Sequence, residues 1–369
     1  MTTARRWWLV AVGVVVLVAA PVLVHALPAG GPDISAPTLL QRIQGSADVP
    51  YAGYAESAGS LSLPAPAELS GLGDLLGGRT RLRTWWRSAD DWRVDNIRAT
   101  GESDLFHDAR GTTRWVYESL TATRRPNLPV RLPDPSDLLP PTLARRMLAG
   151  ARADEVSRLP AMRIAGRVAP GLRLRPSDPA SGVDHVDVWA DADSGVPLRV
   201  DVDGTAYDTL DRAGVPALTT AFQTFSSRRP AASVTAFNPP PGATLRFDRG
   251  IDIAAAADQF AHSRPPSRLA GLAERPGAPT RAVGVYGSGP TLLVAVPLWS
   301  QVARPLHDEL ESTAGMRRTP IGVLVGAGPL GVLLTYPDDT GSSWLVGGTV
   351  TPETLRRAVA ELPKPLEHP

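Results

Sequence analysis

The chain has 369 residues, enough for two domains of ordinary size, and its formal net charge is +1. This balance excludes the strong positive field by which proteins attract nucleic acid. The sequence contains no cysteine, which excludes disulfides, thiolate metal sites, a thiol nucleophile and a bacterial lipobox.

The N-terminal segment is predicted to export or anchor the chain. Arg5 and Arg6 precede an uncharged apolar run from Trp7 to Val24, which is about long enough to span a bilayer. The positive-inside rule then places the rest of the chain outside the cytoplasm. A retained single-pass anchor and a signal peptide cleaved before Leu27 both fit this pattern. We expect a cell-membrane location, or secretion if the segment is cleaved.

Short alternating segments dominate the region that follows. Ser35 can cap a helix over Ser35–Gln44, and later helices are predicted over Pro141–Leu148 and Ala153–Arg158. Turn residues separate the alternating runs, which favours a large antiparallel sheet. The predicted strands are Tyr51–Leu63, Thr80–Arg87, Asp91–Ala99, Asp104–Asp108, Thr112–Tyr117, Ala161–Val168, Val183–Ala190, Val196–Val202 and Leu218–Phe225.

The last third of the chain predicts a small α+β domain. Its strands are expected near Arg281–Val285, Thr291–Val296, Gly322–Val325 and Gly331–Thr335, and its helices over Ile253–Gln259, Pro305–Glu311 and Thr354–Leu362. The predicted organisation is a signal segment at 1–27, a linker at 28–35, a sheet domain at 36–250 and a C-terminal domain at 251–369.

Three patterns that imitate catalytic or cofactor motifs are better explained as turns or scattered residues. Gly326 to Gly331 matches GxGxxG, but no room follows for the helix and acidic residue of a dinucleotide site, so a hairpin is favoured. Asp339-Thr340-Gly341 imitates an aspartic-protease loop without a matching second lobe. The six histidines form no zinc-binding pair. We expect no enzyme activity, cofactor or metal.

The order of two hairpins and a closing segment carries a family resemblance. The first hairpin is Trp86-Arg87 followed by Asp91-Trp92-Arg93-Val94; the second runs from Val186 through Asp191 and Gly195 to Pro197-Leu198-Arg199; the closing segment is Phe237 to Gly242. Over about residues 36–247 this order resembles the superfamily of the lipoprotein-localisation carrier LolA and the sigma-E regulatory proteins RseB and MucB, in particular its actinobacterial members.

The resemblance implies an α+β fold in which an N-terminal helix precedes a strongly curved antiparallel half-barrel with a helical plug. The implied role is to hold a lipid, acyl chain or lipoprotein in an apolar cavity without chemistry. The rival is an envelope-stress sensor whose C-terminal domain docks a membrane protein, such as an anti-sigma factor; an exporter is the partner that would favour transport.

Aromatic strand residues are the candidates for the wall of such a cavity: Trp86, Trp92, Val94, Trp115 and Trp189. Ordinary core packing is the alternative for them. Alternation along the strand also places four arginines on the face opposite Leu82, Thr84 and Trp86, where they serve a lipid headgroup, an acidic partner or simple solvation: Arg79, Arg81, Arg83 and Arg87.

Overall fold

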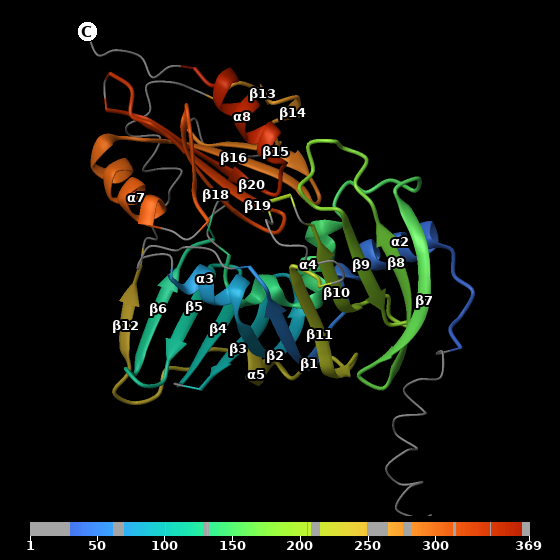
Figure 1. The fold of residues 1–369 in the computed structure, drawn as a ribbon. Helices are drawn as coiled ribbons and strands as arrows, with labels where there is room; N and C mark the ends of the chain where they lie inside the picture. The colour runs from blue at the N-terminus through green and yellow to red at the C-terminus, as the bar shows by residue number, and fades with distance from the viewer. Residues whose placement is uncertain are drawn as a thin grey trace, which may run out of the picture.

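A computed structural model describes residues 30–61, 70–99, 101–127, 131, 133–204, 206–207, 215–248, 265–275, 282–312, 315–339 and 341–363. Two β-sheets organise these residues, one of 12 strands and one of six, beside a separate two-stranded ribbon. The six-stranded sheet lies against one end of the larger sheet (Figure 1).

The large sheet is built from strands that follow each other closely along the chain. Its spatial order is β12-β6-β5-β4-β3-β2-β1-β11-β10-β9-β8-β7. Neighbouring strands pair antiparallel except β12, which runs parallel to β6. The strands are β1 Tyr51–Gly59, β2 Arg79–Ser88, β3 Asp91–Arg98, β4 Gly101–Asp108, β5 Gly111–Val116, β6 Thr121–Arg125, β7 Val156–Ile164, β8 Arg167–Leu174, β9 His185–Ala190, β10 Pro197–Asp203, β11 Leu218–Ser226 and β12 Thr244–Phe247.

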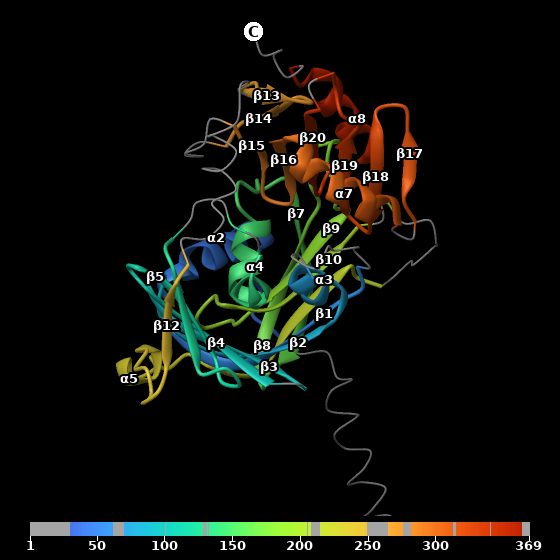
Figure 2. The same ribbon diagram turned by 90° about the vertical axis from the view of Figure 1, so that its left-hand side faces the viewer.

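The large sheet is strongly curved, and α2 and α4 lie on its concave side (Figure 2). We call this side the inner face and the opposite side the outer face. The helical segments are α2 Ala36–Gly45, η1 Ser46–Asp48, α3 Ser70–Gly77, η3 Pro135–Leu138, α4 Pro140–Met147 and α5 Ala232–Thr235. We call the segment 133–149, which contains η3 and α4, the cap. The curved antiparallel sheet with its helical plug confirms the predicted fold class.

Local sequence explains why the covering helices form where they do. The Ser35 hydroxyl accepts a hydrogen bond from the Thr38 amide and caps α2, as the sequence predicts. Leu39 and Ile43, four positions apart, are buried on one side of this helix. In α4, Pro140 and Pro141 occupy the first turn, where a missing amide costs nothing. Both helices therefore bury an apolar side against the inner face.

The second sheet has the order β15-β16-β20-β19-β18-β17. It has its own apolar cores, which are separate from the core of the large sheet. This region matches the small α+β domain predicted for the last third of the chain. The elements are β13 Arg268–Leu269, β14 Leu272–Ala273, β15 Gly284–Ser288, β16 Thr291–Leu298, α7 Ser300–Ser312, β17 Arg317–Thr319, β18 Gly322–Ala327, β19 Leu330–Thr335, β20 Ser343–Gly348 and α8 Pro352–Glu361.

One tyrosine from the first sheet domain is buried in the second. Tyr207 belongs to the core of the six-stranded sheet, and its hydroxyl donates to the Val350 carbonyl at 2.7 Å. A Cβ atom at Gly326 or Gly331 would lie 2.3 or 2.1 Å from an atom of the Tyr207 ring. These two glycines face each other across the β18–β19 hairpin. The GxGxxG pattern is therefore a hairpin, as predicted, and its glycines leave space for Tyr207.

Some predicted elements are wrong or displaced. Ala153–Arg158 is not a helix, because β7 begins at Val156. The strand predicted over Ala161–Val168 crosses a turn at Ala165 and Gly166, whose positive φ angles of 49° and 75° suit a tight hairpin. Sequence reasoning also missed β6, β12 and β17, which are short or carry few apolar residues, and it missed β20 and most of β8.

Two predictions lie outside the described residues: the apolar N-terminal segment and the helix over Ile253–Gln259. Within the part of the chain that the structure describes, no helix has both the length and the hydrophobicity to cross a membrane.

Candidate functional site

The inner face carries a row of four stacked aromatic rings. Tyr51, Trp86, Trp92 and His107 lie directly opposite one another on β1, β2, β3 and β4. Their ring centroids are 5.8, 5.6 and 4.7 Å apart along the row, and successive planes are tilted by only 5°, 4° and 6°. Cross-strand register therefore builds a continuous aromatic surface from residues that are distant in sequence.

The cap closes over this surface. Leu139 and Leu143 of the cap are buried in the same core as Tyr51, Trp86 and Trp92. Side chains of the protein itself thus occupy the inner face in this arrangement. A ligand on the aromatic row has to take the place of cap side chains.

Ion pairs hold the two parts of the cap together. The buried Asp137 carboxylate accepts two hydrogen bonds from Arg131, at 2.6 and 3.0 Å, and one from Arg146, at 2.7 Å. These bonds lower the pKa of Asp137, although burial acts against them. Among the described residues, the cap has few polar bonds to the rest of the domain: Thr220 donates to the Leu138 carbonyl, and Gln44 to the Leu148 carbonyl. The cap is therefore an internally braced unit that rests on the sheet mainly through apolar contacts.

Unpaired polar atoms are concentrated where the cap meets the aromatic row. In the described residues, seven buried side-chain nitrogen or oxygen atoms have no hydrogen-bond partner. Five of the seven belong to α4 or to the inner face of β1 and β2, on Tyr51, Thr84, Trp86, Thr142 and Arg145. Each such atom costs about 1–3 kcal/mol when it is left unpaired in a folded protein. Closure of the cap over the row therefore leaves these polar atoms unpaired, which costs free energy.

Arg145 is the charged member of this group. Its guanidinium carbon lies 5.7 Å from the centre of the Trp86 ring, and its Nη1 atom is buried without a partner. Burial lowers the pKa of the Arg145 guanidinium, while Tyr51 and Asp48 act in the opposite direction. Burial also raises the pKa of the Tyr51 hydroxyl well above its usual range. The hydroxyl is therefore neutral at physiological pH and provides no counter-charge.

The structure divides the five residues proposed for a cavity wall between the two faces. Trp86, Trp92 and Val94 lie together on the inner face, since Trp86 opposes Trp92 and both Trp92 and Val94 are buried in its core. Trp115 opposes Asp104 on the outer face and packs against Phe237, with ring centroids 6.0 Å apart. Trp115 therefore lies away from the row.

Trp189 also points away from the row. It lies opposite Arg199, whose guanidinium carbon is 5.6 Å from the Trp189 ring centre, and its indole nitrogen donates to the Pro160 carbonyl. Its neighbour Val188 lies opposite Leu172 and Val200 on the inner face, because successive residues of a strand alternate between faces. Trp189 is nevertheless buried in the same apolar core as Val188.

The outer face of β3 and β4 carries a cluster of buried charges. Arg93 donates to Asp95 at 2.6 and 3.1 Å and to Asp104 at 2.7 Å, and the Tyr117 hydroxyl also donates to Asp104. Burial, followed by the nearby Asp104 carboxylate, raises the pKa of Asp95 to about 7, while Arg93 lowers it. With Glu102, the two aspartates are close enough for a cation. Arg93 already donates to both aspartates, so we interpret the cluster as an internal ion-pair network.

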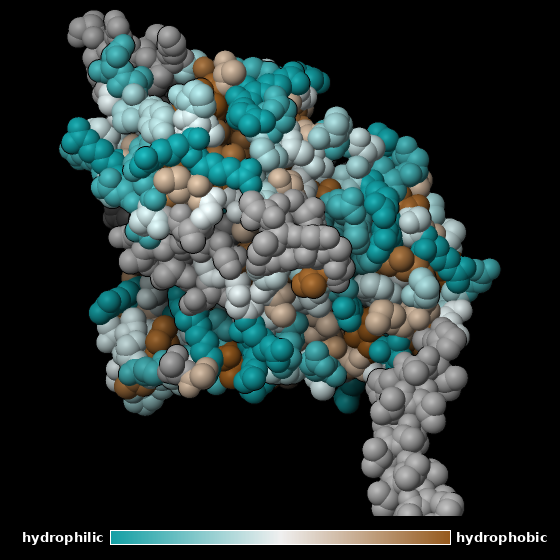
Figure 3. All heavy atoms as spheres, in the orientation of Figure 1, coloured by the Kyte–Doolittle hydropathy of each residue, from teal (hydrophilic) through white to brown (hydrophobic). Residues whose placement is uncertain are grey.

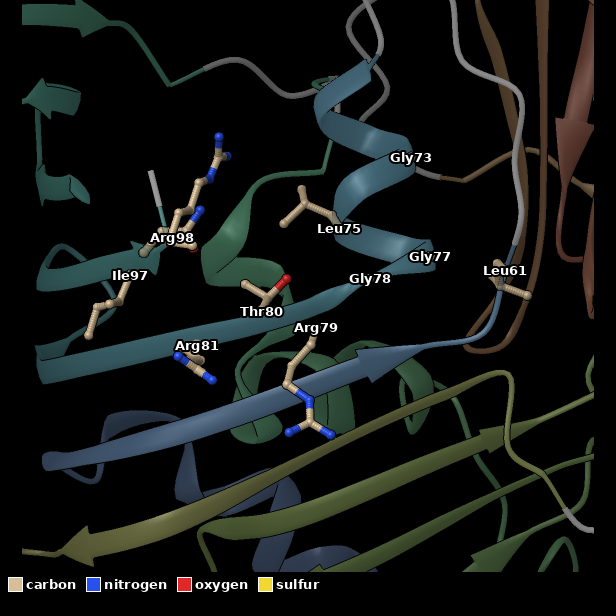
Figure 4. Close-up of a pocket in the computed structure, with 12 residues that line it drawn as sticks. Leu61, Gly73, Leu75, Gly77, Gly78, Arg79, Thr80, Arg81, Ile97 and Arg98 are labelled. Atoms are coloured by element: carbon tan, nitrogen blue, oxygen red, sulfur yellow. The ribbon is translucent and has the colours of Figure 1, made fainter. Parts of the chain in front are cut away.

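A pocket of about 550 Å³ opens at the other end of β2, beneath α3 (Figure 4). Leu61, Leu75 and Ile97 give it apolar patches, and three arginines line its rim: Arg79, Arg81 and Arg98. Thr80 shares the inner face with Trp86, six residues along β2, or about 20 Å at the rise of a strand. Arg79 and Arg81 were predicted on the face of β2 opposite Leu82 and Trp86. The structure agrees, since the two arginines are exposed while Leu82 and Trp86 are buried.

The remaining surface shows no comparable apolar feature on the face that Figure 3 presents. Among the described residues on that face, hydrophobic ones are scattered singly between hydrophilic ones. Single exposed apolar residues are normal and mark no binding site. The aromatic row beneath the cap is therefore the stronger candidate for an apolar ligand.

Sequence reasoning missed Tyr51 and Arg145. Tyr51 was recognised only as the start of a strand, and its place in the row depends on long-range register. Arg145 and Thr142 are three residues apart on α4, a spacing that puts both on one side of a helix. The spacing is visible in the sequence, but no sequence signal shows that the polar atoms of Arg145 and Thr142 lack partners.

Comparison with known proteins gives structural likenesses only. No protein-family model matches the chain, and no curated protein matches its sequence. Among solved structures, MucB in the Pseudomonas aeruginosa MucA/MucB complex is 15% identical, with a TM-score of 0.49, over 89% of this chain and 98% of that chain. Another structure of MucB, in complex with the periplasmic part of MucA, is 16% identical, with a TM-score of 0.47, over 90% and 100% of the two chains.

A LolA superfamily protein from Nitrosomonas europaea is 12% identical, with a TM-score of 0.24, over 55% of this chain and 98% of that chain. MucB and the LolA superfamily are the proteins that the order of elements in this sequence resembles.

Proposed function

We propose that this chain is a non-catalytic, extracytoplasmic protein that binds the apolar part of a lipid, acyl chain or lipoprotein on the inner face of its large sheet. The observation that carries the proposal is the row of four stacked rings beneath a separately braced cap. Such a surface shields an acyl chain from water, which is worth about 0.8 kcal/mol for each buried CH2 group.

Binding on the row requires the cap to move. The helix of the cap, Pro140–Met147, has eight residues, and isolated helices of that length are unstable in water. The cap holds its position through apolar contacts that a ligand chain can replace, together with the bonds from Thr220 and Gln44. A ligand that binds only the open arrangement shifts the population toward it.

The N-terminal segment supports an extracytoplasmic setting for this role. Two arginines followed by an apolar run through Val24 are typical of export signals and signal anchors. We propose that the segment tethers the protein to the cytoplasmic membrane, with the sheet domains outside, or that the protein is secreted after cleavage. Whether tethered or secreted, the protein then exposes the aromatic row to a compartment that contains lipids and lipoproteins.

A contact between the cap and the second domain favours a sensor as the second candidate function. A Cβ atom at Gly289, in the β15–β16 turn, would lie 2.8 and 2.9 Å from the carbonyl oxygens of Ala149 and Met147 at the end of α4. Movement of the cap therefore has to disturb this turn. If the protein is a sensor, ligand binding changes how the C-terminal domain docks a membrane partner such as an anti-sigma factor.

Matched tryptophan variants test the proposed binding surface. Trp92 and Trp115 are both buried, at 6% and 3% exposure, but they lie on opposite faces of the same sheet. Substituting either with leucine leaves a similar defect in packing. We expect Trp92→Leu to lower the binding of methyl palmitate by the full chain about tenfold, which corresponds to about 1.4 kcal/mol, whereas Trp115→Leu leaves it unchanged.

Native mass spectrometry of the full chain in a nonionic detergent measures this binding as the fraction of protein that carries methyl palmitate. Thermal unfolding of both variants checks that they remain folded to the same extent. Equal loss of binding in the two variants, or no binding by the unaltered protein, contradicts the proposal.

A further inference from the structure

The unpaired atoms beneath the cap share one chemical character. The Nη1 atom of Arg145 and the indole nitrogen of Trp86 can only donate hydrogen bonds, and the hydroxyls of Tyr51, Thr84 and Thr142 can also donate. A ligand group that satisfies this set must accept several hydrogen bonds at once. Carboxylate and phosphate groups have this property, whereas an ester or an alkyl chain has it weakly or not at all.

The charge of Arg145 points to an anion. Two other arginines, Arg131 before the cap and Arg146 within it, are both paired with the Asp137 carboxylate. Arg145 has no carboxylate within ion-pair distance in the part of the chain that the structure describes, although it is half-buried beside Trp86. A half-buried guanidinium without a counter-ion is unusual, because burial of a charge is costly unless it is paired. Among the described residues, Asp48 acts on Arg145 only from beyond ion-pair distance, so a ligand anion can take the place of the missing partner.

The anion site at Arg145 is adjacent to the apolar surface of the aromatic row. Trp86 belongs to the aromatic row and also lies under the Arg145 guanidinium. Arg145 remains partly accessible to solvent, while Trp92, next in the row, is buried. An amphiphile can therefore place its charged group at Arg145 and its chain along the row.

We propose that Arg145, with Trp86, Tyr51 and Thr142, binds the carboxylate or phosphate group of an anionic amphiphile whose chain occupies the inner face. This inference rests on the proposed function, since it names the class of ligand that the row accepts. The cost of the unpaired donors in the closed cap then favours opening toward a ligand that pairs them.

Two probes with the same chain separate the anion site from the apolar surface. Palmitate carries a carboxylate, and methyl palmitate has the same chain without the charge. Inorganic phosphate and acetate supply the anion without a chain. Native mass spectrometry of the full chain in a nonionic detergent, with each probe added at the same concentration, gives the fraction of protein that is loaded.

We expect the unaltered protein to bind palmitate about tenfold more tightly than methyl palmitate, and Arg145→Gln to abolish this preference while methyl palmitate still binds. Arg145→Lys keeps the charge without the forked donors and is expected to retain part of the preference. Two variants serve as controls that keep the preference in full. Arg152→Gln removes an exposed arginine paired with Asp154, and Arg98→Gln removes one from the rim of the open pocket.

The outcomes separate this inference from the function on which it rests. Binding of neither palmitate nor methyl palmitate overturns both. Equal binding of the two probes by the unaltered protein overturns the anion site alone, and so does a preference that survives in Arg145→Gln or is lost in Arg98→Gln. Binding of phosphate or acetate that depends on Arg145 supports the site and identifies a free anion as its source.

A measurement of stability keeps the test independent of folding. A residue that serves the fold destabilises the protein when it is removed, whereas removal of an unpaired, half-buried charge does not. Arg145→Gln is therefore expected to unfold at the temperature of the unaltered protein or above it. A clear fall in this temperature, together with loss of methyl palmitate binding, contradicts the assignment of Arg145 to the ligand.

Discussion

Two arginines on opposite faces of the large sheet have opposite surroundings. On the outer face, Arg93 binds Asp95 and Asp104 and lies between the rings of Trp85 and Phe106, with its guanidinium carbon 5.1 and 4.7 Å from their centres. On the inner face, Arg145 lies over one ring and its buried Nη1 atom has no partner. The comparison teaches that the structural charge of Arg93 has its partners within the fold, whereas the buried donor of Arg145 has none among the described residues, and a ligand is expected there.

The largest expected effect comes from the paired arginine. Arg93→Met leaves Asp95 and Asp104 buried without their counter-ion, and removal of one partner of a buried ion pair costs about 3–5 kcal/mol. Urea unfolding measures this loss in the free energy of unfolding. An effect below about 1 kcal/mol would show that the outer cluster is not structural and would remove the contrast between the two arginines.

A smaller effect is expected from pH, again on the outer face. The pKa of Asp95 is raised from 3.8 to about 7 in the folded protein, mainly by burial. Between about pH 4 and pH 7 the folded state therefore holds a proton that the unfolded state has lost, so stability falls as the pH rises through this window.

Asp95→Asn cannot titrate and should remove this part of the pH dependence. Urea unfolding of both proteins at pH 4.5, 6 and 8 provides the comparison. Identical pH profiles for the variant and the unaltered protein would mean that Asp95 ionises normally.

The sequence was sufficient to predict many of the local elements and the fold class. Ser35 marked the start of α2, alternation in Arg79 to Arg87 separated the exposed from the buried side of β2, and the Gly195 turn placed one hairpin. Alternation within a strand is local, so a short window of sequence contains it.

The site could be predicted only in part, because it depends on register and on partners. Of the tryptophans proposed for a cavity wall, Trp86 and Trp92 lie side by side on the inner face. Trp115 and Trp189 look the same in sequence but point to the other face. One residue of register decides which face a side chain takes. The missing partner of Arg145 is a property of three-dimensional packing, and the neighbouring Arg146 has the same sequence context but is paired with Asp137.

Movement of the cap is the central claim, and the lack of native cysteine allows it to be measured directly. Spin labels on Ala149→Cys, at the exposed end of the cap, and Arg79→Cys, on the exposed side of β2, report the distance between cap and sheet. Our account predicts that palmitate shifts this distance distribution to longer values. An unchanged distribution in protein shown by mass spectrometry to carry palmitate would contradict it, because the ligand would then be bound somewhere other than beneath the cap.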